Sequence, residues 1–496
     1  MTLTSNYLAF DLGAESGRAV LGRLDGDTLA LSTLCRFSNG PVRVLGSYFW
    51  DALRLFQELK DGLSLYRRER NEELDGIGLD TWGVDFALLG RDDQLLGNPH
   101  HYRDPRTEGM LPVAFAAVPR ETIFDRTGIQ FMEINTLYQL LAMRRCGDAT
   151  LEAAHTLLMM PDLLNFWLTG IKTCEFSDAT TTQCFNPRTG DWARDLLERL
   201  DLPTRVFQPV VQPGTIIGGL RGDVTEEVGL GATPVIAPAC HDTGSAVAAV
   251  PADGQDFAYI SSGTWSLMGV EVREPVITAD SLAFNFTNEG GVCGTYRLLK
   301  NIMGLWLVQE CRRTWASEGK EYSYDELTRL AAEVPAFGPL VDPDAHEFLR
   351  PGDMPARIIA FCRATGQRSP ASRGEMVRTA LESLALKYRW VLKRLEVMLG
   401  RRLNTIHIVG GGSQNRLLCQ LAADATRRPV VAGPVEATAA GNVLMQALAR
   451  GRLGSLDDAR AVVRRSFDVV RYEPCINDGW DEAYARFLAV QREGQV

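Results

Sequence analysis

The chain has 496 residues, of which 45% are hydrophobic and 23% charged, and it carries a formal net charge of −10 at pH 7. This composition is typical of a globular protein and excludes the disordered and fibrous classes. The net negative charge argues against nucleic acid as a partner. The arginine pairs, such as Arg67-Arg68 and Arg464-Arg465, are scattered among acids and apolar residues and do not form a basic cluster in the sequence. The length predicts two large domains rather than one.

The sequence gives no sign of export or of membrane insertion. Asp11 and Glu15 interrupt the N-terminal segment, and no apolar run approaches the ~20 residues that a bilayer span needs. The 10 cysteines are spread from Cys35 to Cys475 without a C-x-x-C pair, which is typical of reduced thiols rather than of a disulfide or zinc framework. We therefore expect a soluble cytoplasmic protein that binds neither membrane nor nucleic acid.

Strand and helix signals alternate along the chain and predict the α/β class. Residues 7–11 are predicted as a strand that ends in an acid, 12–18 as a tight turn, and 19–23 as the returning strand of a hairpin. Residues 77–89 form another strand-rich stretch, which is broken by Gly83. A further apolar strand, 234–239, leads directly into His241 and Asp242.

The same layout recurs in the second half, where 257–261 predict a strand, 262–266 a turn and 267–271 the returning strand. Apolar residues between Val377 and Leu399 follow a helical spacing, and Gly400 is expected to end that helix. A strand at 405–409, three glycines and a helix from about Asn415 follow. The repetition predicts two domains, 1–246 and 247–496, with a boundary near 246–256.

The tripeptide His241-Asp242-Thr243 is the most informative feature of the chain. It places an acid at the end of a predicted strand with only small residues after it, so a substrate has room to approach. This is where a general base for a hydroxyl group is expected. The alternative is that Asp242 caps a helix, which capping statistics alone favour.

Three loops rich in Gly, Ser and Thr can direct backbone N–H groups at phosphates. The first follows Asp11, whose carboxylate suits Mg²⁺ directly or through water. The second surrounds Thr264, and the third is the glycine run 410–412 before a helix. Each loop alone is more often a plain turn, and the chain has neither a P-loop nor a G-x-G-x-x-G motif. Their order over both halves favours a nucleotide site.

These motifs together resemble those of the FGGY carbohydrate kinases. The resemblance runs in family order from residue 7 to about 445 and is carried by Asp11–Arg18, Tyr102–Thr107, Phe176–Thr182, His241-Asp242, Ser262–Thr264 and Gly410–Asn415. It implies two actin/hexokinase-like (ribonuclease H-like) domains around a central cleft that closes on a sugar and ATP–Mg²⁺. It also implies a small-molecule sugar as the partner, and we expect a monomer or weak homodimer.

The resemblance further implies roles for individual residues. Asp242 would be the catalytic base, and Gly83, His241 and Thr243 would contact the sugar. Glu15 departs from the family pattern, in which many members have a small hydroxyl residue, so we expect it to turn outward or toward Arg18 or the metal. The residues implied to hold ATP are Ala14, Glu15, Ser16, Gly17, Arg18, Thr264, Asn301, Gln309 and Gly411.

The activity implied by the resemblance is ATP-dependent phosphorylation of a ketose. The motifs 79–86 and 135–139 point to L-rhamnulose, a 6-deoxy ketose, with transfer to O1, while xylulose, fuculose or a glycerol-like polyol remain alternatives. A non-catalytic actin-type ATP-binding protein would not need Asp242 beside His241, and a sugar-binding repressor would need an N-terminal helix-turn-helix. Trp82 and Phe131 are candidates for an apolar wall against the sugar methyl, with ordinary core packing as the alternative. Asp85 is expected to make structural hydrogen bonds.

Overall fold

The computed structural model describes residues 4–70 and 72–491 and divides into two compact units. Unit 1 consists of Met1–Ala249, Glu271–Leu298 and Ala437–Ser466, and unit 2 of Val250–Val270, Leu299–Glu436 and Phe467–Val496. Two segments from the second half of the sequence therefore belong to unit 1. Among the described residues, no helix combines the length and the apolar composition that a membrane span requires.

Unit 1 is organised around a six-stranded sheet with the order β13-β14-β6-β1-β2-β3. Its strands are β1 (Ser5–Leu12), β2 (Ser16–Asp25), β3 (Thr28–Ser38), β6 (Gly76–Thr81), β13 (Thr215–Gly219) and β14 (Pro234–Ala237). The predicted hairpin is confirmed, since β1 and β2 pair antiparallel. Strands β1 and β6 are buried along their whole length, as expected for a sheet covered on both faces.

The parallel strands of this sheet deliver several polar residues to one edge. Strand β6 runs parallel to both β1 and β14. In this register Asp11 pairs with Asp80, and an isolated bridge links Thr81 to His241. Because the carboxyl ends of parallel strands meet at one edge of a sheet, the acids that end β1 and β6 come together with Asp242.

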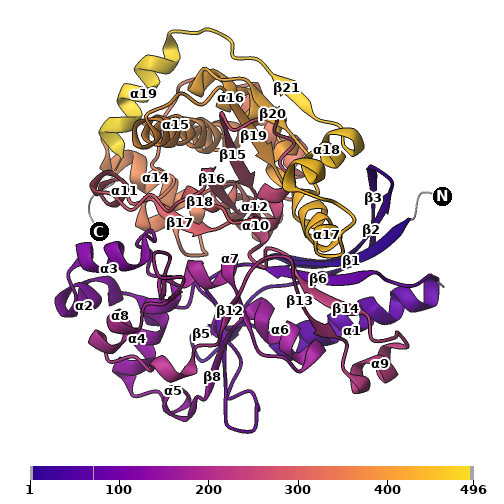
Figure 1. Ribbon diagram of the computed structural model, residues 1–496. Coiled ribbons are helices and arrows are strands. Elements are labelled where there is room, and N and C mark those ends of the chain that lie inside the picture. The colour runs from indigo at the N-terminus through magenta and orange to yellow at the C-terminus, as the bar shows by residue number, and fades with distance from the viewer. Residues whose placement is uncertain (1–3, 71, 492–496) are drawn as a thin grey trace. The chain divides into compact units, whose positions relative to one another are not determined.

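Helices of unit 1 cover this sheet and build a second core beside it. In Figure 1 the gold helices α17 and α18 lie beside the indigo strands β1 to β3, although they are far apart in sequence. Gly78 of β6 allows this approach, because a Cβ there would lie 2.2 Å from Asn442 Oδ1 of α17. The helices are α1 (Ala52–Glu69), α2 (Met110–Ala117), α3 (Arg120–Thr127), α4 (Thr136–Cys146), α5 (Ala149–Ala153), α6 (Met160–Thr169), α7 (Phe176–Ala179), α8 (Arg194–Arg199), α9 (Gly222–Val228), α10 (Asp242–Ala248), α11 (Ala279–Ala283), α17 (Ala437–Ala449) and α18 (Leu456–Ser466), with short 3₁₀ helices at Pro105–Thr107, Thr180–Thr182 and Thr204–Val206.

The second core of unit 1 contains the aromatic residues between Phe86 and Phe207. Phe131 belongs to it, with 2% of its surface exposed and its ring centroid 5.2 Å from that of Phe115. Core packing, and not a sugar wall, is therefore the role of Phe131. The remaining strands of the unit are β4 (Val42–Val44), β5 (Ser47–Phe49), β7 (Phe86–Leu89), β8 (Thr156–Met159), β9 (Cys174–Glu175), β10 (Phe185–Asn186), β11 (Asp191–Trp192), β12 (Val210–Val211), β17 (Thr287–Gly290) and the start of β18 (Tyr296–Met303).

Unit 2 is built on β15 (Phe257–Ser262), β16 (Trp265–Val272), β19 (Thr405–Val409), β20 (Val430–Ala432) and β21 (Val470–Tyr472). The predicted hairpin of β15 and β16 is confirmed, and β15 runs parallel to β19. The helices are α12 (Trp306–Ser317), α13 (Tyr324–Ala332), α14 (Met354–Ala364), α15 (Arg373–Leu399), α16 (Arg416–Thr426) and α19 (Gly479–Val490), with 3₁₀ helices at His346–Phe348 and Gly411–Gln414.

The long helix α15 follows the predicted apolar spacing and ends at Gly400, whose φ of 62° is left-handed. It begins at Arg373, before the predicted start, because the Ser372 hydroxyl caps it by accepting a hydrogen bond from the Glu375 N–H. The helix predicted from about Asn415 is confirmed as α16, and the Asn415 side chain caps it through the Leu418 N–H.

Candidate active site

His241 and Asp242 stand where the chain passes from β14 into α10, with Asp242 as the first residue of the helix. The small residues that follow, Thr243 to Ala248, are all buried. They let α10 approach α17 closely: a Cβ at Gly441 would lie 1.8 Å from the Ser245 carbonyl oxygen. Helix packing is therefore the structural reason for these small residues.

The Asp242 carboxylate combines partial exposure with charged neighbours. No side-chain capping hydrogen bond is made at the start of α10, and 31% of the Asp242 side chain is exposed. Thr243 Oγ1 donates to Asp242 Oδ1 at 3.2 Å. Desolvation by the surrounding protein raises the pKa of Asp242, the charge of Asp11 raises it further, and His241 opposes the shift.

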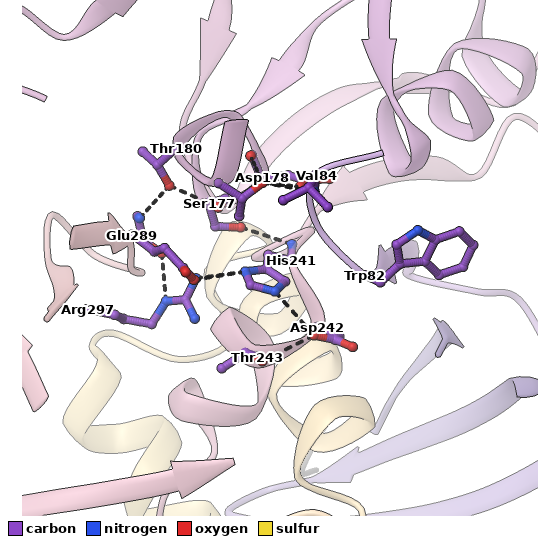
Figure 2. A network of polar contacts seen from close by, with 12 residues as sticks. Trp82, Val84, Ser177, Asp178, Thr180, His241, Asp242, Thr243, Glu289 and Arg297 are labelled. Atoms are coloured by element: carbon purple, nitrogen blue, oxygen red, sulfur yellow. Dashed lines mark hydrogen bonds and ion pairs between the residues drawn. The ribbon is translucent and has the colours of Figure 1, made fainter. Parts of the chain in front are cut away.

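His241 is held by a group of polar residues, of which Glu289 and Arg297 were not singled out by the sequence motifs (Figure 2). Its Nε2 lies 3.6 Å from Asp242 Oδ1, and its Nδ1 lies 3.3 Å from Glu289 Oε2 and 3.1 Å from Arg297 Nη2. Its backbone N–H donates to Ser177 Oγ at 3.1 Å. Glu289 and Arg297 come from β17 and β18, so only the folded chain brings them to His241.

Asp11 and Asp80 lie on neighbouring strands at the same edge of the sheet. Asp80 is fully buried and accepts a hydrogen bond of 2.6 Å from Asn442 Nδ2. Burial raises its pKa well above the usual range, and the charges of Asp11 and Asp242 add to the shift. Arg18 Nε and Nη2 donate to Asp11 Oδ2 at 2.9 and 2.7 Å, so the structure brings these two predicted residues into direct contact.

Asp11 suits a magnesium ion that is bound through water. Within residues 4–70 and 72–491 there is no group of three or more His, Cys, Asp or Glu residues that could hold a metal ion. Mg²⁺ is commonly bound by one or two carboxylates together with waters and substrate phosphates, so a closed protein cage is not required. Because Arg18 already takes up one oxygen of Asp11, a contact through water fits this carboxylate best.

Asp85 organises the aromatic residues beside Gly83. Its buried carboxylate accepts hydrogen bonds from Trp50 Nε1 at 2.6 Å, Trp82 Nε1 at 3.0 Å and Gln139 Nε2 at 2.9 Å. Burial raises its pKa to about 6, although these hydrogen bonds act to lower it. The ring centroids of Trp50 and Trp82 are 3.9 Å apart. The predicted structural role of Asp85 is confirmed, and that role is to fix the orientation of Trp82.

Gly83 and Gly17 both have a structural reason within the protein. A Cβ at Gly83 would lie 3.0 Å from the side chain of Thr181, whose hydroxyl accepts a hydrogen bond from the Val84 N–H. A Cβ at Gly17 would lie 2.2 Å from the Phe37 ring. Glu15 is exposed in the turn between β1 and β2, with Ala14 before it and Ser16 opening β2.

The two predicted loops of unit 2 follow adjacent parallel strands, so the Thr264 and Gly411 segments lie at the same edge of the sheet. Gly410 has a left-handed φ of 82°, and a Cβ at Gly412 would lie 2.0 Å from Ser262 Oγ. Gly411 is different, because a Cβ there would have no atom within 4 Å. Of these three glycines, Gly411 is the one that faces open space.

Asn301 and Gln309 flank the segment that joins β18 to α12. The N–H groups of Gly304 and Leu305 donate to the carbonyls of Thr264 and Gly263, both at 3.1 Å. This segment therefore holds the Thr264 loop against the start of α12, the helix that carries Gln309. Gln309 Oε1 is buried without a hydrogen-bond partner in the described part of the chain, so it is available as an acceptor.

Models of two domains of the FGGY family of carbohydrate kinases match this chain, the N-terminal domain over residues 6–249 and the C-terminal domain over 258–450. The chain is 47% identical to a protein named rhamnulokinase from Bacteroides thetaiotaomicron, covering 98% of this chain and 99% of that protein. It is 40% identical to a rhamnulokinase from Oceanobacillus iheyensis, covering 95% and 99% of the two chains.

Solved structures of sugar kinases share the fold. A xylulose kinase from Rhodospirillum rubrum has a TM-score of 0.77 at 20% identity, covering 98% of both chains. A glycerol kinase from Plasmodium falciparum with ADP has a TM-score of 0.75 at 16% identity, also covering 98% of both. The predicted α/β fold with two actin/hexokinase-like domains is thus confirmed, and ATP is the phosphoryl donor that a kinase uses. The chain belongs to the FGGY family of carbohydrate kinases.

Proposed function

We propose that this protein transfers the γ-phosphoryl group of ATP to O1 of L-rhamnulose, giving L-rhamnulose 1-phosphate and ADP, in the breakdown of L-rhamnose. The observation that carries the proposal is the 47% identity, over almost the whole of both chains, to a protein named rhamnulokinase. Several further relatives with that name are 40–42% identical. The alternative is a kinase of the same family for another ketose, such as xylulose or fuculose.

Asp242 is the general base in this proposal. As O1 of the sugar attacks the γ-phosphorus, its proton passes to the Asp242 carboxylate, the new O–P bond forms, and the bond to the β–γ bridging oxygen breaks with its electron pair leaving on ADP. The raised pKa of Asp242 favours proton acceptance. His241 and Thr243 would orient the carboxylate and the sugar hydroxyls, with Gly83 beside the sugar.

The nucleotide is assigned to the three loops. Residues 14–18 and Thr264 would bind the phosphates, with Asn301, Gln309 and Gly411 toward the nucleoside. Asp11 would hold Mg²⁺ through water, and the ion when bound neutralises charge on the phosphate oxygens. The open space at Gly411 and the available Gln309 oxygen support this assignment. We place the enzyme in the cytoplasm, as a monomer or weak homodimer.

Trp82 is proposed as the apolar contact for the C6 methyl group. Its ring is held by Asp85 and lies tilted against Trp50, and 6% of its surface is exposed, so any contact with the methyl group would be made by a rigid ring. A hydrophobic surface rejects an added hydroxyl only modestly, by roughly 10²-fold. A changed hydroxyl configuration should be rejected more strongly, because it leaves polar groups of the site unpaired.

The experiment that tests the function is a coupled ADP-release assay over L-rhamnulose, L-fuculose, D-xylulose and D-fructose. We expect the highest kcat/KM for L-rhamnulose, and ³¹P–¹H correlation of the product should place the phosphate on O1. A clearly higher kcat/KM for xylulose or fuculose would overturn the substrate assignment and leave the sugar-kinase activity in place. No ADP release with any sugar would contradict the activity itself.

A further inference from the structure

A buried ion pair lies behind His241, on the side of the ring away from Asp242 (Figure 2). The Arg297 side chain is completely buried, and the side chains of Glu289 and His241 keep only 5% and 9% of their surface exposed. Arg297 Nη2 lies 3.2 Å from Glu289 Oε2. Neither residue belongs to the motifs that carry the catalytic assignment.

The pair is fixed rigidly in the protein. Arg297 Nε donates to the Gly290 carbonyl at 2.8 Å, so the guanidinium plane is anchored to the end of β17, the strand that also carries Glu289. From that position the same guanidinium reaches both Glu289 and His241 Nδ1. A fixed planar fork of this kind is a property of arginine that lysine lacks.

Stability alone does not account for such a pair. Desolvation of two buried charges commonly outweighs their attraction, and well-packed apolar residues of similar volume often stabilise a protein equally well or better. The pair instead contacts Nδ1 of His241, the ring nitrogen on the side away from Asp242. A hydrogen-bonding partner at one ring nitrogen of a histidine fixes the orientation of the ring and what the other nitrogen can do.

We propose that Glu289 and Arg297 are positioning residues, which hold the His241 ring so that its Nε2 faces the Asp242 carboxylate and the reacting hydroxyl of the sugar. The inference rests on the proposed role of Asp242 as base. The ring is then held from two sides, at Nδ1 by the ion pair and through the backbone by Ser177 Oγ, which accepts from the His241 N–H.

Loss of this support should affect turnover more than binding. The last torsion of a histidine side chain is broad, so a ring without a partner at Nδ1 samples several orientations. Misplacement of a catalytic group by about 1 Å lowers rates on the order of 10²-fold. Glu289→Gln keeps the shape of the side chain and removes its charge, and we expect kcat to fall by about 10- to 100-fold while the KM for ATP stays within about twofold of wild type.

A double-mutant cycle separates positioning from a general structural effect. Wild type, Glu289→Gln, Asp242→Asn and the double variant are compared by kcat in the ADP-release assay with L-rhamnulose. If Glu289 acts through His241 on Asp242, the Glu289→Gln change should lower kcat little or not at all once Asp242 is already Asn. Multiplicative losses in the double variant would overturn the proposal.

Two further variants complete the test. Glu271→Gln disrupts another largely buried pair of unit 1, that of Glu271 with Arg460, and should lower the melting temperature without changing kcat. Arg297→Lys keeps the positive charge but loses the planar guanidinium that reaches both Glu289 and His241, so kcat should fall as it does in Glu289→Gln. This variant tests the positioning role if Glu289→Gln does not fold. Wild-type kcat in both Glu289→Gln and Arg297→Lys would refute the positioning role, whereas an inactive wild type would refute the proposed function instead.

Discussion

At the scale of single residues, Asp242 combines partial exposure, a raised pKa and a histidine that lies against its carboxylate. Asp242→Asn keeps the size of the side chain and removes the proton acceptor. We expect kcat to fall by roughly 10²–10⁴-fold, with a smaller effect on sugar binding. The ADP-release assay measures the first quantity and calorimetric titration of the sugar the second.

The opposite pattern would count against this assignment. Near-normal turnover by the Asp242→Asn variant would place the base elsewhere. Loss of both turnover and sugar binding, together with a lower melting temperature, would indicate a structural role for Asp242. Retained sugar binding without turnover is the result that the geometry leads us to expect.

Asp11 provides a second test at this scale. Its carboxylate lies near the end of β1 and is paired with Arg18, so Asp11→Ala removes the oxygen that would bind a magnesium-bound water and also removes this ion pair. We expect the Mg²⁺ concentration for half-maximal activity to rise, or activity to be lost. Magnesium titrations of this variant and of Arg18→Lys, which keeps the pair, measure the effect. An unchanged Mg²⁺ dependence in Asp11→Ala would exclude Asp11 as the ligand.

At the scale of elements, the glycines between β19 and α16 can be separated by their surroundings. In Gly411→Leu the new side chain would begin in open space, so the melting temperature should not change. It should raise the KM for ATP, because it would occupy space that the nucleotide needs. Gly412→Ala is the matched control, because its Cβ would collide with Ser262 and should destabilise the loop. Equal increases in KM for ATP and for sugar in Gly411→Leu would show that the loop does not bind the nucleotide.

Two buried acids, Asp162 at the start of α6 and Glu175 before α7, make stability depend on pH. Burial raises the pKa of Asp162 from 3.8 to about 8, with the charge of Glu175 adding to the shift, and burial raises the pKa of Glu175 from 4.5 to about 7. Between about pH 4 and pH 8 the folded protein therefore retains protons that the unfolded chain has released. The free energy of unfolding should fall as pH rises through this range.

Melting temperatures measured between pH 5 and pH 8 test this dependence. Asp162→Asn imitates the protonated acid, so its melting temperature should decline less with pH than that of wild type. Asp253→Asn changes an exposed acid and should retain the wild-type slope. A decline that is the same in Asp162→Asn and in wild type would contradict the contribution of Asp162.

Local sequence patterns predicted those elements that depend on local interactions. The two hairpins, the left-handed end of α15 at Gly400 and the Asn415 cap each depend on residues within a few positions of one another. The sequence singled out Asp11 and Asp242 because each lies close to the end of a predicted strand, and their roles stay predictions. Glu289 and Arg297 could not be found this way, because their partner His241 is distant in sequence and neither lies in a distinctive motif.

The small residues after Asp242 illustrate a second limit. Gly, Ser and Ala next to an acid fit both substrate access and close helix packing, and the sequence does not distinguish the two. The contact between Ser245 and Gly441 decides for packing, and it joins residues from opposite halves of the chain. Such a contact has no local signal.

At the scale of the whole molecule, the expected cleft, with the Asp11 and Thr264 loops facing each other, stays a prediction. A crystal structure with an ATP analogue and L-rhamnulose would test it directly. We expect density for the nucleotide phosphates beside both loops, and O1 of the sugar within hydrogen-bond distance of Asp242. A sugar bound far from Asp242 would contradict the arrangement.

The discontinuous make-up of unit 1 has a consequence for how the protein is made. Glu289 and Arg297 come from Glu271–Leu298, and Asn442, which donates to Asp80, comes from Ala437–Ser466. During synthesis the N-terminal 249 residues leave the ribosome before α17 and before Glu289 and Arg297, two of the partners of His241. This edge of the sheet is therefore completed only after α17 has emerged, when almost the entire chain has been translated. A chain that ends before Ala437 lacks α17 and the Asn442 partner of Asp80, so this edge of the sheet stays incomplete in it.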